Sequence, residues 1–184
     1  MRELLEPGPA AEGRIGYRRV EATEAVAISE VVNLSDALMW VQGALAELYA
    51  TVTAQGARIC GPAGGIFADE LIANERGLAT VFVPFAGDIR RTGRLTELVV
   101  PAAELVTVVH AGSYHDFDLA YGALATHVAQ HAISVDEPIR EYFLVGPPRH
   151  PRRNGLAHRN WLASLSHHHR LSLPTVHQLC RDVC

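Results

Sequence analysis

The sequence contains no lysine, so arginine supplies all 16 of its basic side chains. It is also poor in cysteine, with only Cys60, Cys180 and Cys184. Three cysteines without a repeated CxxC spacing exclude a disulfide framework and a paired-cysteine zinc motif, which favours a reducing, cytoplasmic location. No run of about 18 apolar residues occurs, so the sequence predicts no membrane-spanning helix. The first residues, M-R-E-L-L-E-P-G-P, lack the apolar core of a signal peptide.

Charge is unevenly distributed along the chain. Residues 1–145 carry 10 Arg against 19 Asp and Glu, a net charge of about −9. Residues 146–184 carry 6 Arg and a single Asp, about +5, together with six of the ten His. The acidic part argues against direct nucleic-acid binding, because phosphate contacts need clustered cations. The apolar fraction of 48% is ample for the core of one domain.

The residue pattern predicts one domain built from two similar halves. Residues 1–16, rich in Pro and Gly, predict a flexible leader. The first half covers about 17–86 and the second about 94–147, each in the order strand, helix, strand. Strands are predicted at 17–28, 58–68, 78–85, 94–100, 104–110 and 139–145. Helices are predicted from a cap at Asn33 or Ser35 to a stop at Gly56, and over 114–131.

The two halves match residue by residue. Ala44-Leu45-Ala46 matches Ala123-Leu124-Ala125, Phe67 matches Phe143, and Gly65 matches Glu141. The first half adds a strand at 79–85, and its counterpart in the second half would fall near residue 160, where no obvious strand is visible. The expected fold class is α+β. It has tandem pseudo-symmetric strand-helix-strand repeats, an antiparallel sheet with two main helices on one face, and a ligand cleft between the halves.

Four short motifs identify a family. They are V-F-V-P-F at 81–85, H-A-G-S-Y at 110–114, A-Y-G-A-L at 120–124 and R-E-Y-F-L-V-G-P at 140–147. By their order and spacing, residues 17–147 resemble the gyrase inhibitor-like (GyrI-like) family. This is also called the bacterial transcription activator effector-binding domain, and it forms the ligand-binding half of several MerR-type and AraC-type regulators. Ser113 replaces the proline usual in the family's turn, and Phe143 stands where tyrosine is common.

The resemblance implies a fold like that of the SOUL haem-binding proteins and a small hydrophobic or cationic ligand, without a cofactor. It also implies a closing strand with a motif like tryptophan-arginine-threonine-glutamate-isoleucine. Here residues 148–163 read P-R-H-P-R-R-N-G-L-A-H-R-N-W-L-A instead. GC-rich codons for this segment can encode the family motif after a one-base shift. We therefore hypothesise a frameshift at about Pro148, with a divergent basic tail over 148–184 as the alternative.

Glu141 is the foremost candidate for a ligand-binding residue. It shares one face of a short strand with Phe143, because side chains two residues apart point the same way. A carboxylate beside aromatic rings suits a lipophilic cation, and the resemblance implies the same role. The alternative is a solvent-facing glutamate paired with Arg140 or another arginine. Further pocket walls are expected from aromatic residues for which plain core packing is the alternative: Tyr114, Tyr121, Phe67, Phe82 and Trp40.

Other motifs predict no metal or phosphate site. His127 and His131 have the i, i+4 spacing of a metal pair on a helix, but no HExxH motif or third ligand accompanies them. The glycine-rich stretch at 61–65 lacks the lysine of a phosphate-binding loop, so it predicts a tight turn. We expect neither a metal ion nor a cofactor.

The leading functional hypothesis is therefore a small-molecule binding domain linked to transcriptional regulation or a drug response, rather than an enzyme. Two alternatives stay open. A hydrolase of reactive small molecules would use Glu141 as general base with Tyr114 as its partner. A protein-binding gyrase inhibitor would use the acidic surface. The expected partner is a small molecule, not nucleic acid or a membrane, and a homodimer or a protein partner is left open.

Overall fold

The computed structural model describes residues 15–112, 117–131, 133, 138–144 and 159–166. Of 111–112, 117–118 and 159–166 only the backbone is described. The strands are β1 (Ile15–Val20), β2 (Thr23–Asn33), β3 (Arg58–Ile59), β4 (Ala63–Phe67), β5 (Arg76–Ala86), β6 (Thr96–Val100), β7 (Ala103–Gly112), β8 (Ile139–Phe143) and β9 (Arg159–Ser166). The helices are α1 (Leu34–Ala54), α2 (Asp69–Ala73) and α3 (Phe117–Gln130).

These elements largely follow the sequence pattern, and the α+β class is confirmed. The strand predicted at 17–28 is divided into β1 and β2, and the loop predicted at 69–77 contains the short helix α2. Helix α1 is followed by Gly56 at φ 74°, the left-handed conformation that glycine adopts without a steric cost. The predicted stop of this helix is therefore confirmed.

The sheet closes on itself, because its first and last pairs of strands are continuous with each other. Its order is β1-β7-β9-β8-β4-β5-β2-β6, with antiparallel pairing throughout. Because β1 leads directly into β2, and β6 into β7, the β1–β7 and β2–β6 pairings form one continuous ladder, which closes the sheet. Val20 stands opposite Ala103, and Thr23 opposite Val100, in the same register. The ladder is interrupted at Pro101, whose missing N–H suits a break between strands. The sheet thus has an inner and an outer face.

The two halves are related by an internal pseudo-twofold arrangement. Strand β2 corresponds to β7, α1 to α3, β4 to β8, and β5 to β9, and the two halves meet where β4 pairs with β8. Strand β9 pairs with both β7 and β8, as β5 pairs with both β2 and β4. The expectation that the chain supplies no strand near residue 160 is therefore wrong. Without β9, the backbone groups of β7 and β8 that face it would lack partners inside the sheet.

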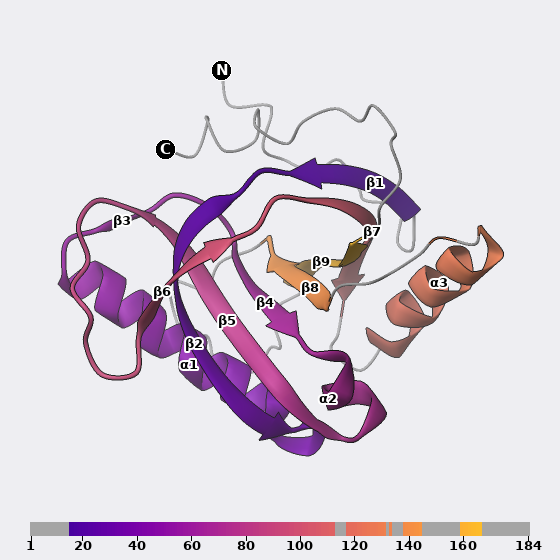
Figure 1. Ribbon diagram of the computed structural model, residues 1–184, viewed down its shortest axis with the longest axis horizontal. Coiled ribbons are helices and arrows are strands. Elements are labelled where there is room, and N and C mark those ends of the chain that lie inside the picture. Colours follow the sequence, from indigo (N-terminus) through magenta and orange to yellow (C-terminus); the bar gives the residue numbers. More distant parts are fainter. Residues whose placement is uncertain (1–14, 113–116, 132, 134–137, 145–158, 167–184) are drawn as a thin grey trace.

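Both large helices pack on the outer face (Figure 1). Helix α1 covers β2 and β5, where alternate residues of each strand point toward it. Helix α3 covers β7, with Ala120 and Leu124 against Val106 and Val108. Each of the Leu and Val side chains in these contacts contributes roughly 1.5–3 kcal/mol when fully buried. The α1 cluster is built on these buried residues: Val26, Ile28, Val32, Val41, Ala44, Leu48, Val52, Val81 and Val83.

The inner face holds a smaller apolar cluster. It combines the buried residues Ala25, Ala27, Phe82 and Val100 with side chains from β4, β6 and β8. Phe82 and Tyr142 meet edge to face, with ring centroids 5.9 Å apart and an interplanar angle of 79°. The small side chains of β2 leave room for these rings. Residues of β8 therefore contribute to both faces of the sheet.

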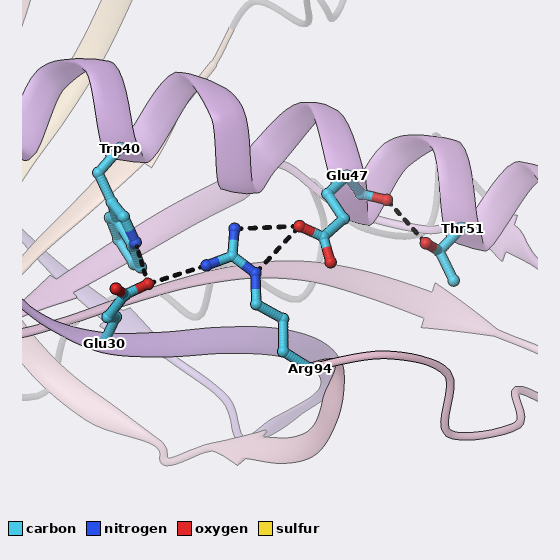
Figure 2. A network of polar contacts seen from close by, with 5 residues as sticks. All are labelled: Glu30, Trp40, Glu47, Thr51 and Arg94. Carbon is cyan, nitrogen blue, oxygen red and sulfur yellow. Dashed lines mark hydrogen bonds and ion pairs between the residues drawn. The ribbon is translucent and has the colours of Figure 1, made fainter.

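A polar network ties the loop between β5 and β6 to α1 (Figure 2). The Arg94 guanidinium donates to Glu30 on β2 at 2.8 Å and to Glu47 on α1 at 3.0 Å. The indole N–H of Trp40 donates to the same Glu30 carboxylate at 2.8 Å. Because these groups are exposed, each ion pair stabilises the fold by no more than about 1 kcal/mol. The network fixes the position of the loop rather than the stability of the core.

Candidate functional site

Glu141 lies where the two halves meet. Strand β8 runs between β4 and β9, and Glu141 stands opposite Gly65 on one side and Ala163 on the other. Ala163 in turn stands opposite Val108, which packs beneath α3. Gly65 stands opposite Val81, which packs beneath α1. In Figure 1 the central strands β4 and β8 accordingly run between the two helices.

The Glu141 carboxylate is buried, with 4% of the residue exposed. The phenol O–H of Tyr121, on α3, donates a hydrogen bond of 2.7 Å to its Oε1 atom. Burial raises the pKa of the Glu141 carboxyl to about 7, because the charged form loses its hydration, and the Tyr121 hydrogen bond opposes this rise. Within the described part of the chain, none of the ion pairs involves Glu141.

Arg140 does not neutralise its neighbour. It points to the inner face of the sheet, as consecutive strand residues do, and is also buried. Its guanidinium donates to the main-chain carbonyl of Pro101 at 2.8 Å, at the break between β6 and β7. It also hydrogen-bonds Tyr142, whose pKa burial raises and Arg140 lowers. The alternative of a solvent-facing Glu141 paired with Arg140 is therefore wrong.

Two phenylalanines flank the carboxylate on the outer face. Phe67 is 8% exposed and lies two residues beyond Gly65 on β4. Phe143 lies two residues beyond Glu141 on β8, is half-buried, and packs against the α1 cluster. The structure thus brings together four of the seven predicted ligand-binding residues: Glu141, Tyr121, Phe67 and Phe143.

Two of the remaining predicted residues, Phe82 and Trp40, do not join this group. Phe82, 1% exposed, lies on the inner face against Tyr142. Trp40 donates its indole hydrogen to Glu30 on β2 (Figure 2). In the sheet, β5 and β4 lie between β2 and the strand β8 that carries Glu141. Tyr114 lies outside the described residues, so the base-and-partner arrangement expected of a hydrolase is not described either.

Gly65 is the site residue that the sequence reasoning did not assign. A Cβ atom at this position would lie 2.6 Å from two ring atoms of Phe67, so the ring rests directly on the glycine backbone. The repeat offered a signal, because it matched Gly65 to Glu141, and the structure places these two residues opposite each other. Glycine here keeps the strand surface beside the carboxylate flat.

His127 of α3 and His131, which directly follows that helix, form a separate cluster. Tyr17 Oη and His127 Nε2 are hydrogen-bonded at 2.8 Å, and the rings of His127 and His131 stack with centroids 4.1 Å apart. Burial, followed by the neighbouring His131, lowers the pKa of His127. Across the residues with described side chains, no group of three His, Cys, Asp or Glu side chains could hold a metal ion. Nor does any helix of that part have the length and apolar character needed to span a membrane.

Comparison with protein families gives one match. The model of a family described as a GyrI-like small molecule binding domain matches residues 17–157. This range includes the four motifs found in the sequence and contains every described residue of the candidate site. No curated protein sequence matches the chain.

Several solved structures share the fold. The crystal structure of the EcmrR C-terminal domain has a TM-score of 0.69 at 14% identity, covering 84% of this chain and 97% of that domain. EcmrR in a complex with DNA has a TM-score of 0.68 at 14% identity. The match covers 84% of this chain but only 57% of the EcmrR chain in that complex. SAV2435 bound to tetraphenylphosphonium has a TM-score of 0.54 at 9% identity, and the match covers 83% of this chain and 93% of SAV2435. At these identities the likenesses establish the fold alone.

Proposed function

The chain belongs to the GyrI-like small molecule binding domain family, and from this membership we propose that its ligand is a lipophilic organic cation held beside Glu141. One observation carries the proposal: a buried carboxylate whose described hydrogen bond comes from a neutral phenol. Burying a carboxylate without an opposite charge costs several kcal/mol, and none of the ion pairs among the described residues offsets that cost for Glu141. A bound cation would offset that cost.

The surroundings suit such a ligand. Phe67, Phe143 and Tyr121 place aromatic groups around the carboxylate, and aromatic faces attract cations. SAV2435, which shares the fold, was solved with tetraphenylphosphonium, a cation of this chemical class. The proposal assigns Glu141 the charge recognition, Tyr121 the orientation of the carboxylate, and Phe143 the apolar contacts.

The likeness to EcmrR supports a wider role in transcriptional regulation. EcmrR, with the same fold in its C-terminal domain, was solved in complex with DNA. We propose that ligand binding to this chain likewise serves transcriptional regulation, in the cytoplasm. DNA contacts would come from another domain or protein, because the acidic charge of residues 1–145 opposes phosphate binding.

Calorimetric titration with tetraphenylphosphonium at pH 8 tests the proposal. Replacing Glu141 by glutamine keeps an acceptor for Tyr121 but removes the charge, so we expect affinity to fall roughly tenfold or more, as when one partner of a buried charge pair is lost. Glu97→Gln is the matched control, because it removes the same charge from an exposed position on β6. Its affinity should stay within about twofold of the wild-type value.

A neutral analogue separates charge from shape. Triphenylphosphine oxide should bind the wild type and Glu141→Gln with similar affinity, since it gains nothing from the carboxylate. Undiminished tetraphenylphosphonium binding by Glu141→Gln would rule out the charge recognition. Mass spectrometry of the ligand after incubation should show no new product, and turnover would favour a hydrolase instead.

A further inference from the structure

The ring of Phe67 rests on the backbone of Gly65. These residues point to the same face of β4, and atoms Cε2 and Cζ of the ring lie 2.6 Å from where a Gly65 Cβ would stand. Since Gly65 is the cross-strand partner of Glu141, the ring covers the strand surface beside the carboxylate. Neighbouring strands lie roughly 4.8 Å apart, so a ring above Gly65 is within contact range of the Glu141 side chain.

The carboxylate is enclosed in this arrangement, so a ligand can reach it only if a side chain moves. Glu141 is 4% exposed, with Tyr121 bonded to one oxygen and Phe67 beside it. Displacing Tyr121 would break its 2.7 Å hydrogen bond to the carboxylate. Displacing Phe67 breaks no hydrogen bond, because its side chain has none to make. Rotation of Phe67 opens the carboxylate without breaking a hydrogen bond, and what it gives up is packing in the apolar cluster beneath α1, to which the ring belongs.

We propose that Phe67 is a plug: without ligand, its ring occupies the place that an aromatic ring of the ligand takes beside Glu141, and it rotates off Gly65 when the ligand enters. This inference rests on the proposed function, which supplies the cationic ligand. The plug also depends on Gly65. Only a residue without a side chain lets one ring, and then another, lie flat against the strand.

The plug defines which cations are accepted. The space that it vacates is one phenyl ring wide and floored by a glycine backbone, so a cation bearing a flat aromatic ring fits it. An aliphatic quaternary ammonium ion of equal charge would leave part of that space empty and lose the packing contacts of a filled cavity. The specificity of the site would thus be set by the side chain that the ligand replaces.

Binding by variants of Phe67 tests the plug. Occupancy of a site by its own side chain weakens apparent affinity by the fraction of molecules that are open. Phe67→Ala should therefore bind tetraphenylphosphonium more tightly, by roughly tenfold. Phe67→Leu should also bind it more tightly, and this variant keeps the test valid if the alanine variant does not fold. Phe82→Leu shortens a buried ring on the inner face and should leave affinity unchanged. Unchanged or weaker binding by both Phe67 variants would overturn the plug.

A measurement without ligand separates the plug from the proposed function. Carboxyl carbon NMR of glutamate-labelled protein, with Glu141→Gln used for assignment, follows the protonation of Glu141. Removing the ring in Phe67→Leu should admit water and lower the pKa of Glu141 toward its ordinary value. Phe82→Leu should titrate like the wild type. A Glu141 titration unchanged in Phe67→Leu refutes the plug, whereas failure of the wild type to bind any cation refutes the proposed function.

Discussion

Gly65 and Glu141 face each other across the antiparallel β4–β8 ladder, and each occupies the same position in its half of the chain. Val81 and Ala163 are their respective outer neighbours, in strands β5 and β9 that also correspond. The pseudo-twofold relation therefore brings two equivalent positions together at the centre of the sheet. One half supplies a bare backbone there and the other a carboxylate, so a symmetric scaffold carries an asymmetric site.

The pH dependence of stability follows from Glu141. Its pKa rises from the ordinary value of 4.5 to about 7 in the folded chain, so the folded state holds this proton more tightly than the unfolded state. The free energy of unfolding should therefore fall as pH rises from about 4.5 to about 7. Glu141→Gln removes this loss, which should make the variant more stable than the wild type by roughly 2–3 kcal/mol at pH 8. Urea unfolding at pH 4.5 and pH 8 measures the difference, which should vanish at the lower pH.

Tyr121 should determine how readily Glu141 ionises. Its hydrogen bond favours the charged carboxylate, so Tyr121→Phe should raise the pKa of Glu141 above about 7. Cation affinity near pH 7 should then fall, because fewer molecules carry the charge. Tyr17→Phe is a matched control that loses its hydrogen bond to His127 instead. An NMR titration of Glu141 that moves equally in both variants would contradict a specific role for Tyr121.

The two adjacent glycines of β4 should differ in their tolerance of a methyl group. A Cβ at Gly64 would meet the main-chain carbonyl oxygen of Glu141 and the Phe82 ring, and the backbone cannot yield. Gly64→Ala should cost about 3 kcal/mol or more. The three atoms nearest to a Cβ at Gly65 all belong to the ring of Phe67 rather than to backbone, so rotation of that ring would relieve the contact and Gly65→Ala should cost less than about 1.5 kcal/mol. Denaturant unfolding of both variants gives the comparison, and equal losses would show that the Phe67 ring is fixed.

Strand β9 should be indispensable for folding. It pairs with β7 on one side and β8 on the other, so its removal would leave each of these strands paired on one side only, β7 with β1 and β8 with β4. A chain ending at Pro147 should fail to give a cooperative thermal transition, whereas a chain ending at Ser166 keeps every described strand and should unfold cooperatively. A folded, cooperative chain of residues 1–147 would show that another segment can replace β9.

The frameshift hypothesis has its own test. DNA sequencing across codons 140 to 184 should reveal whether a one-base shift near Pro148 encodes the tryptophan-to-isoleucine motif. If it does, the chain with the restored frame should place that motif in the position of β9 and unfold at a higher temperature than the chain described. A closed alternative frame would leave residues 148–184 as a genuine basic segment.

Much of the fold could be predicted from the sequence, because the spacing of apolar residues reflects the local geometry of helices and strands. Apolar residues at helical spacing predicted α1 and α3 near their observed bounds, and the repeat predicted that the two halves are equivalent. Strand β9 was missed because Arg159–Ser166 has little alternation of its own. Its place between β7 and β8, rather than its own residues, makes it a strand.

The sequence by itself determined the family, the order of the elements, and the fact that Glu141 and Phe143 share a face, because alternation along a strand is a local property. It did not determine that Phe82 lies on the inner face, or that Trp40 bonds Glu30. Tertiary structure alone decided that Tyr121 reaches Glu141, that Arg140 does not, and that Phe67 lies over Gly65. These contacts depend on strand register and on closure of the sheet, which join residues far apart in the chain.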